Sequence, residues 1–313
     1  MDPISHVLLA RAMSRTSAAS REVPGRTLAF ALGSLAPDAD ILIAPFGWDR
    51  YLAVHEAGLH ALVWSPLLAL AVAGIVQRFA KRTDVRSLVL PAWLGIAAGH
   101  LLFDLVSGSD MRVLSPLWSA RWGPHWITMA DGLAIVVLIA GTIGGFWRRR
   151  LAAWATIVTL FVIVLVKAVS QQWAVQVFEH HNGPVSSHPD AVTGSLWRWT
   201  FFDRQGDRVR AWRVNAWSAS IETLFTRTDA ADDPIVSSTR DVTVVRRLLN
   251  LAHEPFARIE TGDDGKRLVL WSDIRHCSET QCVLSFGVEI DAEGRMLRQL
   301  SRIGPLSQWR GLR

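Results

Sequence analysis

Long apolar runs alternate with short basic segments between about residues 60 and 169. Four runs stand out: "ALVWSPLLALAVAGIVQ", "LVLPAWLGIAAGHLLFDLVS", "ITMADGLAIVVLIAGTIGGF" and "LAAWATIVTLFVIVLVKAVS". Each is close to the roughly 20 residues that an α-helix needs to cross the hydrocarbon core of a bilayer. The pattern therefore predicts about four membrane-spanning helices.

Two shorter apolar stretches precede these runs. They are "ISHVLLARAM" and "TLAFALGSLAPDADILIAP", and polar residues interrupt both. The first has too short an apolar core, and lacks the small-residue cleavage site, for a signal peptide. We expect both stretches to form half-inserted helices, whose polar breaks need protein or water around them.

The sequence becomes mixed and polar after Lys167. Residues 195–217 alternate bulky and polar residues around "DRQGD", which predicts a β-hairpin. "TRDVTVVRRLLNLAH" has helical spacing, and three strands are expected from "KRLVLWSDIRHC" to "CVLSFGVEIDAEGRMLRQLSR". We therefore predict an α-helical integral membrane domain over residues 1–170 and a soluble α+β domain with an antiparallel sheet over residues 171–313.

Positive charge is concentrated in two short loops, "QRFAKRTDVR" and "WRRR". The positive-inside rule places both loops in the cytoplasm. Counting helices then puts residues 55–60, the 108–126 loop and the C-terminal domain outside the cytoplasm. These features predict a multi-pass protein of a bacterial-type inner membrane, with membrane lipids as partners. The net charge of +5 follows from this topology and requires no nucleic acid; the sequence does not indicate an oligomeric state.

The chain has two cysteines, Cys277 and Cys282, in "CSETQC" between two strand-like runs. A hairpin would bring them close enough to bridge, and an extracytoplasmic compartment would permit a disulfide. The alternatives are two free thiols or half of a metal knuckle, although no second cysteine pair completes a four-sulfur site.

Ionisable residues recur within the apolar region, where each costs about 2.5–3.5 kcal/mol and needs a partner. His100 and Asp104 are four positions apart in "GHLLFD", which puts both side chains on one helix face. They could bind a metal together or simply hydrogen-bond to each other as a buried pair.

Two further groups lie in "APDAD" and "HEAGLH". Pro37 disfavours helix at the preceding residue, so the chain is expected to turn at Asp38 and Asp40, and a turn can direct both carboxylates into one site. A helix cap at the membrane surface is the alternative. His55 and His60 converge if one lies in the loop and the other at the start of the spanning helix. Glu56 between them is a candidate base, although its neighbours suggest a solvated face.

His6 in the first segment is expected at the same level, which would be the outer leaflet. Asp131 in "MADG", preceded by His125, is a further candidate, although Asp131 could also cap a helix or pair with Arg121. Histidines mixed with carboxylates suit zinc or manganese better than calcium or magnesium, and the number of ligands allows one or two ions. The candidate metal ligands are His6, Asp40, His55, His60, His100, Asp104 and Asp131.

At these residues the chain resembles the YdjM-like family of LexA-binding, inner-membrane-associated hydrolases, commonly called membrane-bound metal-dependent hydrolases. The resemblance covers about residues 1–145. The family's opening histidine matches His6, and its "PDxD", "HRGxTHS" and "GHxxxD" elements match "PDAD", "HEAGLHA" and "GHLLFD"; a later aspartate is similar to Asp131. Glu56-Ala57 replaces the family's Arg-Gly. Leu59 and Ala61 replace the polar residues that would orient His60.

The resemblance implies a metal-dependent hydrolase. A site at the outer membrane interface suggests an ester or phosphoester of a lipid-like substrate, with Asp38 as a ligand or general base and Glu56 as an alternative base. Two other functions remain open. A non-catalytic membrane protein would use a structural metal or polar site and bind a partner through its outer domain. A transporter would place its ionisable groups deep in the bilayer, but no inverted repeat is visible.

Overall fold

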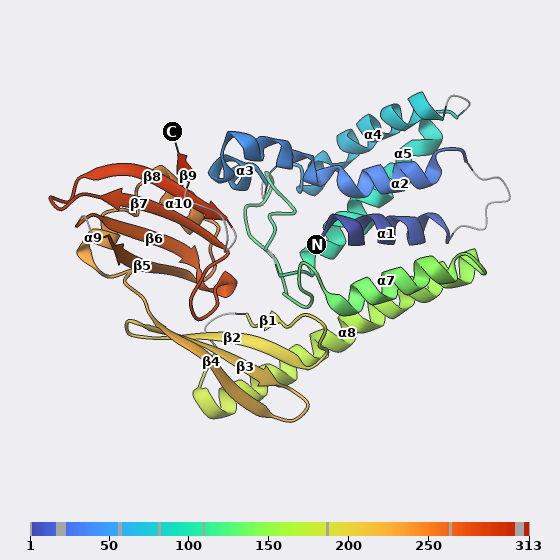
Figure 1. Cartoon of the computed structure of the whole chain (residues 1–313). Coiled ribbons are helices and arrows are strands. Elements are labelled where there is room, and N and C mark those ends of the chain that lie inside the picture. Colours follow the sequence, from blue (N-terminus) through green and yellow to red (C-terminus); the bar gives the residue numbers. More distant parts are fainter. Residues whose placement is uncertain are drawn as a thin grey trace.

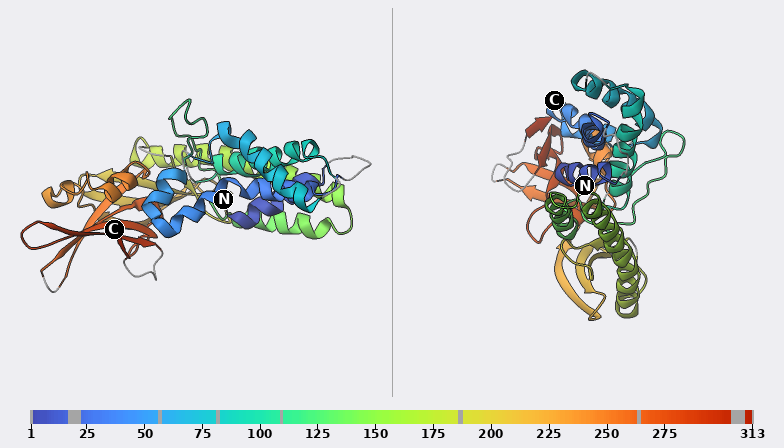
Figure 2. Two further views of the ribbon diagram at one scale, coloured as in Figure 1. Left: turned by 90° about the horizontal axis from the view of Figure 1, so that it is seen from above. Right: turned by 90° about the vertical axis from the view of Figure 1, so that its right-hand side faces the viewer.

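The computed structural model describes residues 2–16, 23–55, 58–80, 83–108, 110–185, 188–262, 265–303 and 310–312. The chain has a helical N-terminal half and a β-rich part, residues 190–312, that lies at one end of the helices (Figure 1). Seen from above, the strands again lie towards one end of the helices (Figure 2, left).

Three helices among the described residues are long and apolar enough to cross a membrane. They cover Leu62–Phe79, Arg86–Leu105 and Arg149–Asn182. The first comprises η2 (Leu62–Trp64) and α4 (Ser65–Phe79). The second comprises α5 (Arg86–Ile96), the π-helical turn η3 (Ala97–Leu101) and α6 (Leu102–Leu105), and the third is α8 (Arg149–Asn182). These helices correspond to three of the four predicted spans.

The remaining predicted span, the third in chain order, forms a shorter helix, α7 (Gly132–Gly144), of 13 residues. At 1.5 Å per residue it covers about 20 Å, less than the roughly 30 Å of a bilayer core. The run is shortened because Asp131 caps the start of the helix through Leu133 N and Ala134 N. A further span is present only if α2 (Arg26–Leu35) and η1 (Pro37–Phe46), which meet at a bend of 45°, count as one.

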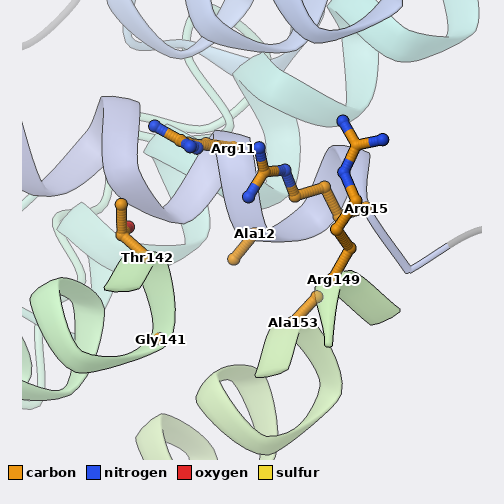
Figure 3. A pocket seen from close by; sticks show the side chains of 7 residues that line it. All are labelled: Arg11, Ala12, Arg15, Gly141, Thr142, Arg149 and Ala153. Atoms are coloured by element: carbon orange, nitrogen blue, oxygen red, sulfur yellow. The ribbon is translucent and has the colours of Figure 1, made fainter. Parts of the chain in front are cut away.

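The basic segments lie together at the end of the helices away from the β-rich part (Figure 1). Arg11 of α1 (Pro3–Ser14), Arg15 at its C-cap and Arg149 of α8 line one small pocket beside the C-terminal end of α7 (Figure 3). The α4–α5 and α7–α8 connections lie at this same end. The side of the membrane that this end faces stays a prediction.

Two glycines allow α2 and α5 to cross at close range. A Cβ on Gly33 would lie 2.3 Å from the carbonyl oxygen of Ala92, and a Cβ on Gly95 would lie 2.3 Å from that of Phe30. No larger residue fits at either position without moving a backbone. The crossing brings Ser34 beside His100.

The β-rich part contains two antiparallel sheets instead of the single expected sheet. The first has the order β1-β2-β3-β4 and the second β5-β6-β7-β8-β9. The strands are β1 (Asp190–Ala191), β2 (Arg198–Gln205), β3 (Arg208–Asn215), β4 (Ser220–Thr228), β5 (Pro255–Thr261), β6 (Arg267–Asp273), β7 (Leu284–Ile290), β8 (Met296–Ile303) and β9 (Arg310–Leu312). The predicted hairpin is β2–β3, and the three strands predicted near the C-terminus are β6, β7 and β8.

Helix α10 (Thr243–Leu249), which the sequence predicts, packs against the second sheet, and a short helix, α9 (Pro234–Ser237), precedes it. Val245 and Leu248 of α10 are buried in one core cluster with Trp271 and Phe286 of the sheet. Cys277 and Cys282 form the predicted disulfide between η4 (Ile274–His276) and β7.

Helix α8 belongs to both parts of the molecule. The predicted domain boundary near Ser170 falls inside this helix, which continues for another 12 residues to Asn182. Trp199 Nε1 of β2 donates to Ser170 Oγ at 2.9 Å, and the Phe178 ring stacks on Phe201 with centroids 4.6 Å apart. The first sheet is therefore packed against the C-terminal turns of α8.

Candidate metal centre

The first group of potential ligands is the His6 triad, which consists of His6, His100 and Asp104. His6 comes from α1, His100 from the π-helical turn η3, and Asp104 from α6 one turn later. The two imidazole rings stack with centroids 4.0 Å apart. His6 Nε2 lies 3.2 Å from Asp104 Oδ1, and His100 Nε2 lies 3.1 Å from Asp104 Oδ2.

Backbone carbonyls fix the tautomers of both histidines. His6 Nδ1 lies 2.9 Å from Gly99 O, and His100 Nδ1 lies 2.7 Å from Ser34 O. A carbonyl oxygen only accepts, so both Nδ1 atoms carry the proton and the neutral rings present a lone pair at Nε2. That lone pair faces the Asp104 carboxylate, which also only accepts. The contact is therefore stable only when a proton or a metal ion lies between them.

The second group is the His60 triad, which consists of Asp38, His55 and His60. Asp38 lies in the first turn of the 3₁₀-helix η1, just after the bend that Pro37 begins. His55 is the last residue of α3 (Trp48–His55), and His60 lies in the turn before η2. His60 Nε2 is 3.3 Å from Asp38 Oδ1. The two histidines converge as predicted but from other positions, because His55 ends a helix and His60 lies in the turn before the span that begins at Leu62.

The two triads adjoin each other. His60 Nε2 lies 3.0 Å from His100 Nε2 and 3.9 Å from Asp104 Oδ2. Asp38 Oδ1 lies 3.6 Å from His100 Nε2. This spacing brings six candidate ligands from five separate chain segments into one cluster.

Asp40 contacts this cluster through His55. Its two carboxylate oxygens lie 3.1 and 3.0 Å from His55 Nδ1, and Asp40 is buried. His60 Nδ1 is a buried atom that has no aligned hydrogen-bond partner among the described residues, and Asp40 Oδ2 lies 3.8 Å away. Asp40 therefore orients His55, while the polar neighbours that Leu59 and Ala61 replace have no substitute at His60 Nδ1 in the described part of the chain.

The donor set suits a divalent metal of the zinc or manganese type. Imidazole nitrogens mixed with carboxylate oxygens are the ligands these ions prefer, and a ligating histidine commonly donates its other N–H to a carbonyl or carboxylate. His6 and His100 meet the second condition through Gly99 and Ser34. The buried Nε2 of His6, which has no aligned hydrogen-bond partner among the described residues, points at the same carboxylate as His100 Nε2.

Two predicted residues are not brought into the cluster. Glu56 lies outside the described residues. Asp131 is fully buried at the start of α7, where its Oδ2 lies 2.5 Å from Nζ of Lys167 on α8 and its Oδ1 caps the helix. It pairs with Lys167 and not with Arg121, whose guanidinium donates to the carbonyls of Leu251 and Asn250.

A second polar network, which sequence reasoning did not find, joins the helical half to the β-rich part. His125 lies between two carboxylates, with Nδ1 2.6 Å from Asp190 Oδ1 and Nε2 3.0 Å from Asp110 Oδ1. Arg275 binds Asp190 through two nitrogens at 2.8 Å and also donates to Gly108 O. His253 forms a close ion contact with Asp110. Nothing in the local sequence signals this network, because its members are up to 165 positions apart.

Burial and these contacts shift the pKa values of the network in opposite directions. Burial favours the neutral form of His125, but hydrogen bonds to Asp110 and Asp190 outweigh it and raise the pKa of His125. Burial would raise the pKa of Asp190, yet His125 and Arg275 lower it to about 2. The pKa of His253 falls, because burial outweighs the attraction of Asp110. The contacts therefore favour the charged form of His125 and the neutral form of His253.

A cavity of about 690 Å³ connects the metal cluster to this network. Tyr51, His55, His60 and Asp104 line one end of the cavity, and Asp110, Asp190 and Arg275 line the other. The volume lies within the roughly 300–1,000 Å³ of small-molecule sites. We call this cavity the interdomain chamber. Tyr51, the chain's single tyrosine, had no place in the predicted site.

Sequence comparison identifies the family of the chain. No curated protein and no solved structure matches the chain. The sequence profile described as "YdjM inner membrane protein" matches residues 1–174, which include both triads and most of α8. The match covers more than half of the 313 residues, so the chain belongs to the YdjM inner membrane protein family.

Proposed function

We propose that the protein is a membrane-bound metal-dependent hydrolase that acts on an ester or phosphoester at the outer membrane interface. The supporting observation is the pair of adjoining triads at one end of the interdomain chamber. Four histidines and two carboxylates converge there, with His6 and His100 oriented by backbone carbonyls. A divalent metal, zinc in the first instance and manganese in the second, would supply Lewis-acid polarisation of the scissile bond and a more acidic water molecule.

The residues have separable roles in this proposal. His6, His100 and Asp104, all buried, would hold one ion. His55 and His60 would hold a second ion or complete the shell of the first, with Asp40 orienting His55. Asp38, whose side chain is 26% exposed, is the carboxylate of the cluster that solvent reaches most easily. It would serve as a ligand or accept a proton from the attacking water.

An enzymatic role fits this site better than a purely structural metal. Structural zinc sites are closed by protein ligands, whereas catalytic sites keep a position open to solvent or substrate. Here His55, His60 and Asp104 line a chamber large enough for a small molecule. A structural site would give no reason for that chamber.

The test is hydrolysis of a panel of phosphomonoesters, phosphodiesters and phospholipids by the purified full chain in lipid nanodiscs. Activity should be lost in His100→Ala and in Asp104→Ala and retained in His181→Ala, a matched change at an exposed histidine. Circular dichroism and elution volume establish that each variant is folded. Unchanged activity in both site variants would refute this assignment, and bound metal without activity on any substrate would favour the structural role.

A further inference from the structure

The walls of the interdomain chamber come from both parts of the molecule. The helical half contributes the metal cluster and an apolar segment with Met111, Ile127 and Met129. The β-rich part contributes Leu248 and Leu251 at the end of α10, together with Leu284 at the start of β7. Direct packing of α10 against α3 holds these walls together.

The charged groups of the far wall are already paired with each other. Arg275 is bound to Asp190, and Asp110 is bound to His125 and His253. The carboxylate of Asp273 accepts from the backbone N–H groups of His253 and Arg275. Each charged group of this wall therefore already has an ion-pair or hydrogen-bond partner inside the protein, so the wall does not require a charged ligand.

The remaining lining is mostly apolar, and its larger side chains are Met111, Ile127, Met129, Leu248, Leu251 and Leu284. Leaving apolar surface against water costs about 25 cal/mol per Å², which favours an apolar occupant. The metal cluster at the other end favours a polar, hydrolysable group. A molecule that satisfies both ends is an amphiphile.

The chamber also lies next to an exposed apolar loop. Met111 of the chamber wall forms a β-bridge with Trp122, which is 68% exposed. Leu117 and Trp118 on the same loop are 84% and 62% exposed. Exposed tryptophans beside a membrane-spanning bundle are typical of the bilayer interface. The loop therefore puts the chamber wall close to the level at which lipids present their ester and phosphate groups.

We propose that the interdomain chamber binds the hydrocarbon chain of a lipid substrate, whose ester or phosphoester group lies against His55, His60 and Asp104. This inference rests on the proposed hydrolase function and adds the substrate class. The β-rich part is then the chain-binding half of the site, and Leu248 and Leu251 contact the hydrocarbon. The bundle alone would hold the metal but would lack the far wall.

Photolabelling of the full chain in nanodiscs tests this assignment. The probe is a hexadecyl phosphonate with a diazirine at the last carbon, which the enzyme cannot hydrolyse. Trypsin releases residues 248–258 as one peptide, because Arg247 precedes it and Arg258 ends it. Residues 151–167 of α8, which include the exposed Leu151, Val158 and Phe161, form a second peptide that reports labelling from the bilayer itself.

We expect label on both peptides in the wild type. Leu251→Trp, which fills the chamber, should reduce label on residues 248–258 about tenfold, equivalent to about 1.4 kcal/mol of binding, and leave residues 151–167 unchanged. Asn250→Trp, at an exposed neighbour that does not line the chamber, is the matched control. A second filling variant, Ala252→Phe, covers the case that Leu251→Trp does not fold.

Label confined to residues 151–167, or equal label on residues 248–258 in all variants, would overturn the chamber assignment. The readout does not depend on turnover, so the two proposals fail separately. Labelling that persists while no substrate is hydrolysed leaves a lipid-binding chamber and refutes the hydrolase. Hydrolysis without labelling of residues 248–258 retains the hydrolase and refutes the chamber.

Discussion

Nε2 of His60 and Nε2 of His100 lie 3.0 Å apart, although the two residues are 40 positions apart in the chain. His100 Nδ1 donates to Ser34 O, so its Nε2 is a lone pair in the neutral ring. Two adjacent imidazole nitrogens of this kind require a proton or a metal ion in common. The contact therefore makes metal content the most direct test of the site.

The His60→Ala, His100→Ala double variant should lose the bound metal. It removes one ligand from each triad, and the remaining residues cannot form either set of three. Elemental analysis of protein purified without chelator should show zinc or manganese in the wild type and in His181→Ala, but not in the double variant. Equal metal in all three proteins would contradict both triads.

Asp131→Asn should leave metal content unchanged, because the structure places Asp131 with Lys167 and outside both triads. Asparagine keeps the helix cap to Leu133 N. Loss of metal in this variant would restore Asp131 as a ligand, as the family resemblance implies.

Lys167→Met should destabilise the protein by about 3–5 kcal/mol, because it leaves the fully buried Asp131 carboxylate without its cation. Adding Asp131→Asn should recover most of that loss, since no buried charge then remains. Thermal unfolding in detergent measures both variants. A single variant as stable as the wild type would show that the pair is not charged.

Gly33→Ala should lower stability by about 1–3 kcal/mol, because a new methyl group would overlap the Ala92 carbonyl. It should also reduce metal content, since Ser34 is the neighbouring residue and positions His100. Gly74→Ala on α4 is the matched control, because a Cβ there meets nothing within 4 Å. Equal effects of the two changes would refute the close crossing of α2 and α5.

His125→Asn should cost more stability at pH 6 than at pH 9. The pKa of His125 is raised in the folded state, so its stabilising charge is fully present below the unfolded value of about 6.5 and is lost as pH rises through the folded value. Asp110 and Asp190 stay ionised over this range because their pKa values are lowered.

His253 titrates with the opposite sign, since its lowered pKa opposes folding as pH falls. Its pKa is lowered partly by His125, so the variant also relieves part of this opposition, and the difference between the two proteins reports both effects. Asparagine is chosen because His125 has a φ of 58°, a conformation that asparagine tolerates. A loss of stability that is the same at both pH values would contradict a cationic His125.

The sequence predicted the ligand groups because their spacing is local. His100 and Asp104 share a helix face, and Pro37 predicts the turn that contains Asp38. The orienting contacts could not be predicted in this way. Ser34 and Gly99 act through their backbone carbonyls, which any residue possesses, and only the packing of α2 and α1 against His100 and His6 selects them.

The apolar runs indicated the helices but not their lengths. Asp131 was considered as a metal ligand because a charge beside an apolar run needs a partner. Its partner, Lys167, lies 36 positions away in another apolar run, for which the hydropathy pattern predicted only a membrane-spanning helix. The second sheet and the His125 network depend on contacts between distant segments, which periodicity does not report.

Helix α8 has 34 residues and therefore extends about 50 Å, some 20 Å more than a bilayer core requires. Its C-terminal turns, from Ser170 to Asn182, form a stalk that packs against Trp199 and Phe201 of the first sheet. Removing one residue from that stalk would turn the first sheet by about 100° about the helix axis and carry Asp190 of β1, which lines the chamber, away from the metal cluster. The number of residues between Ser170 and Asn182 thus sets the angular register of the two halves of the site. A change of three or four residues in the stalk, close to one helical turn, would disturb this register least.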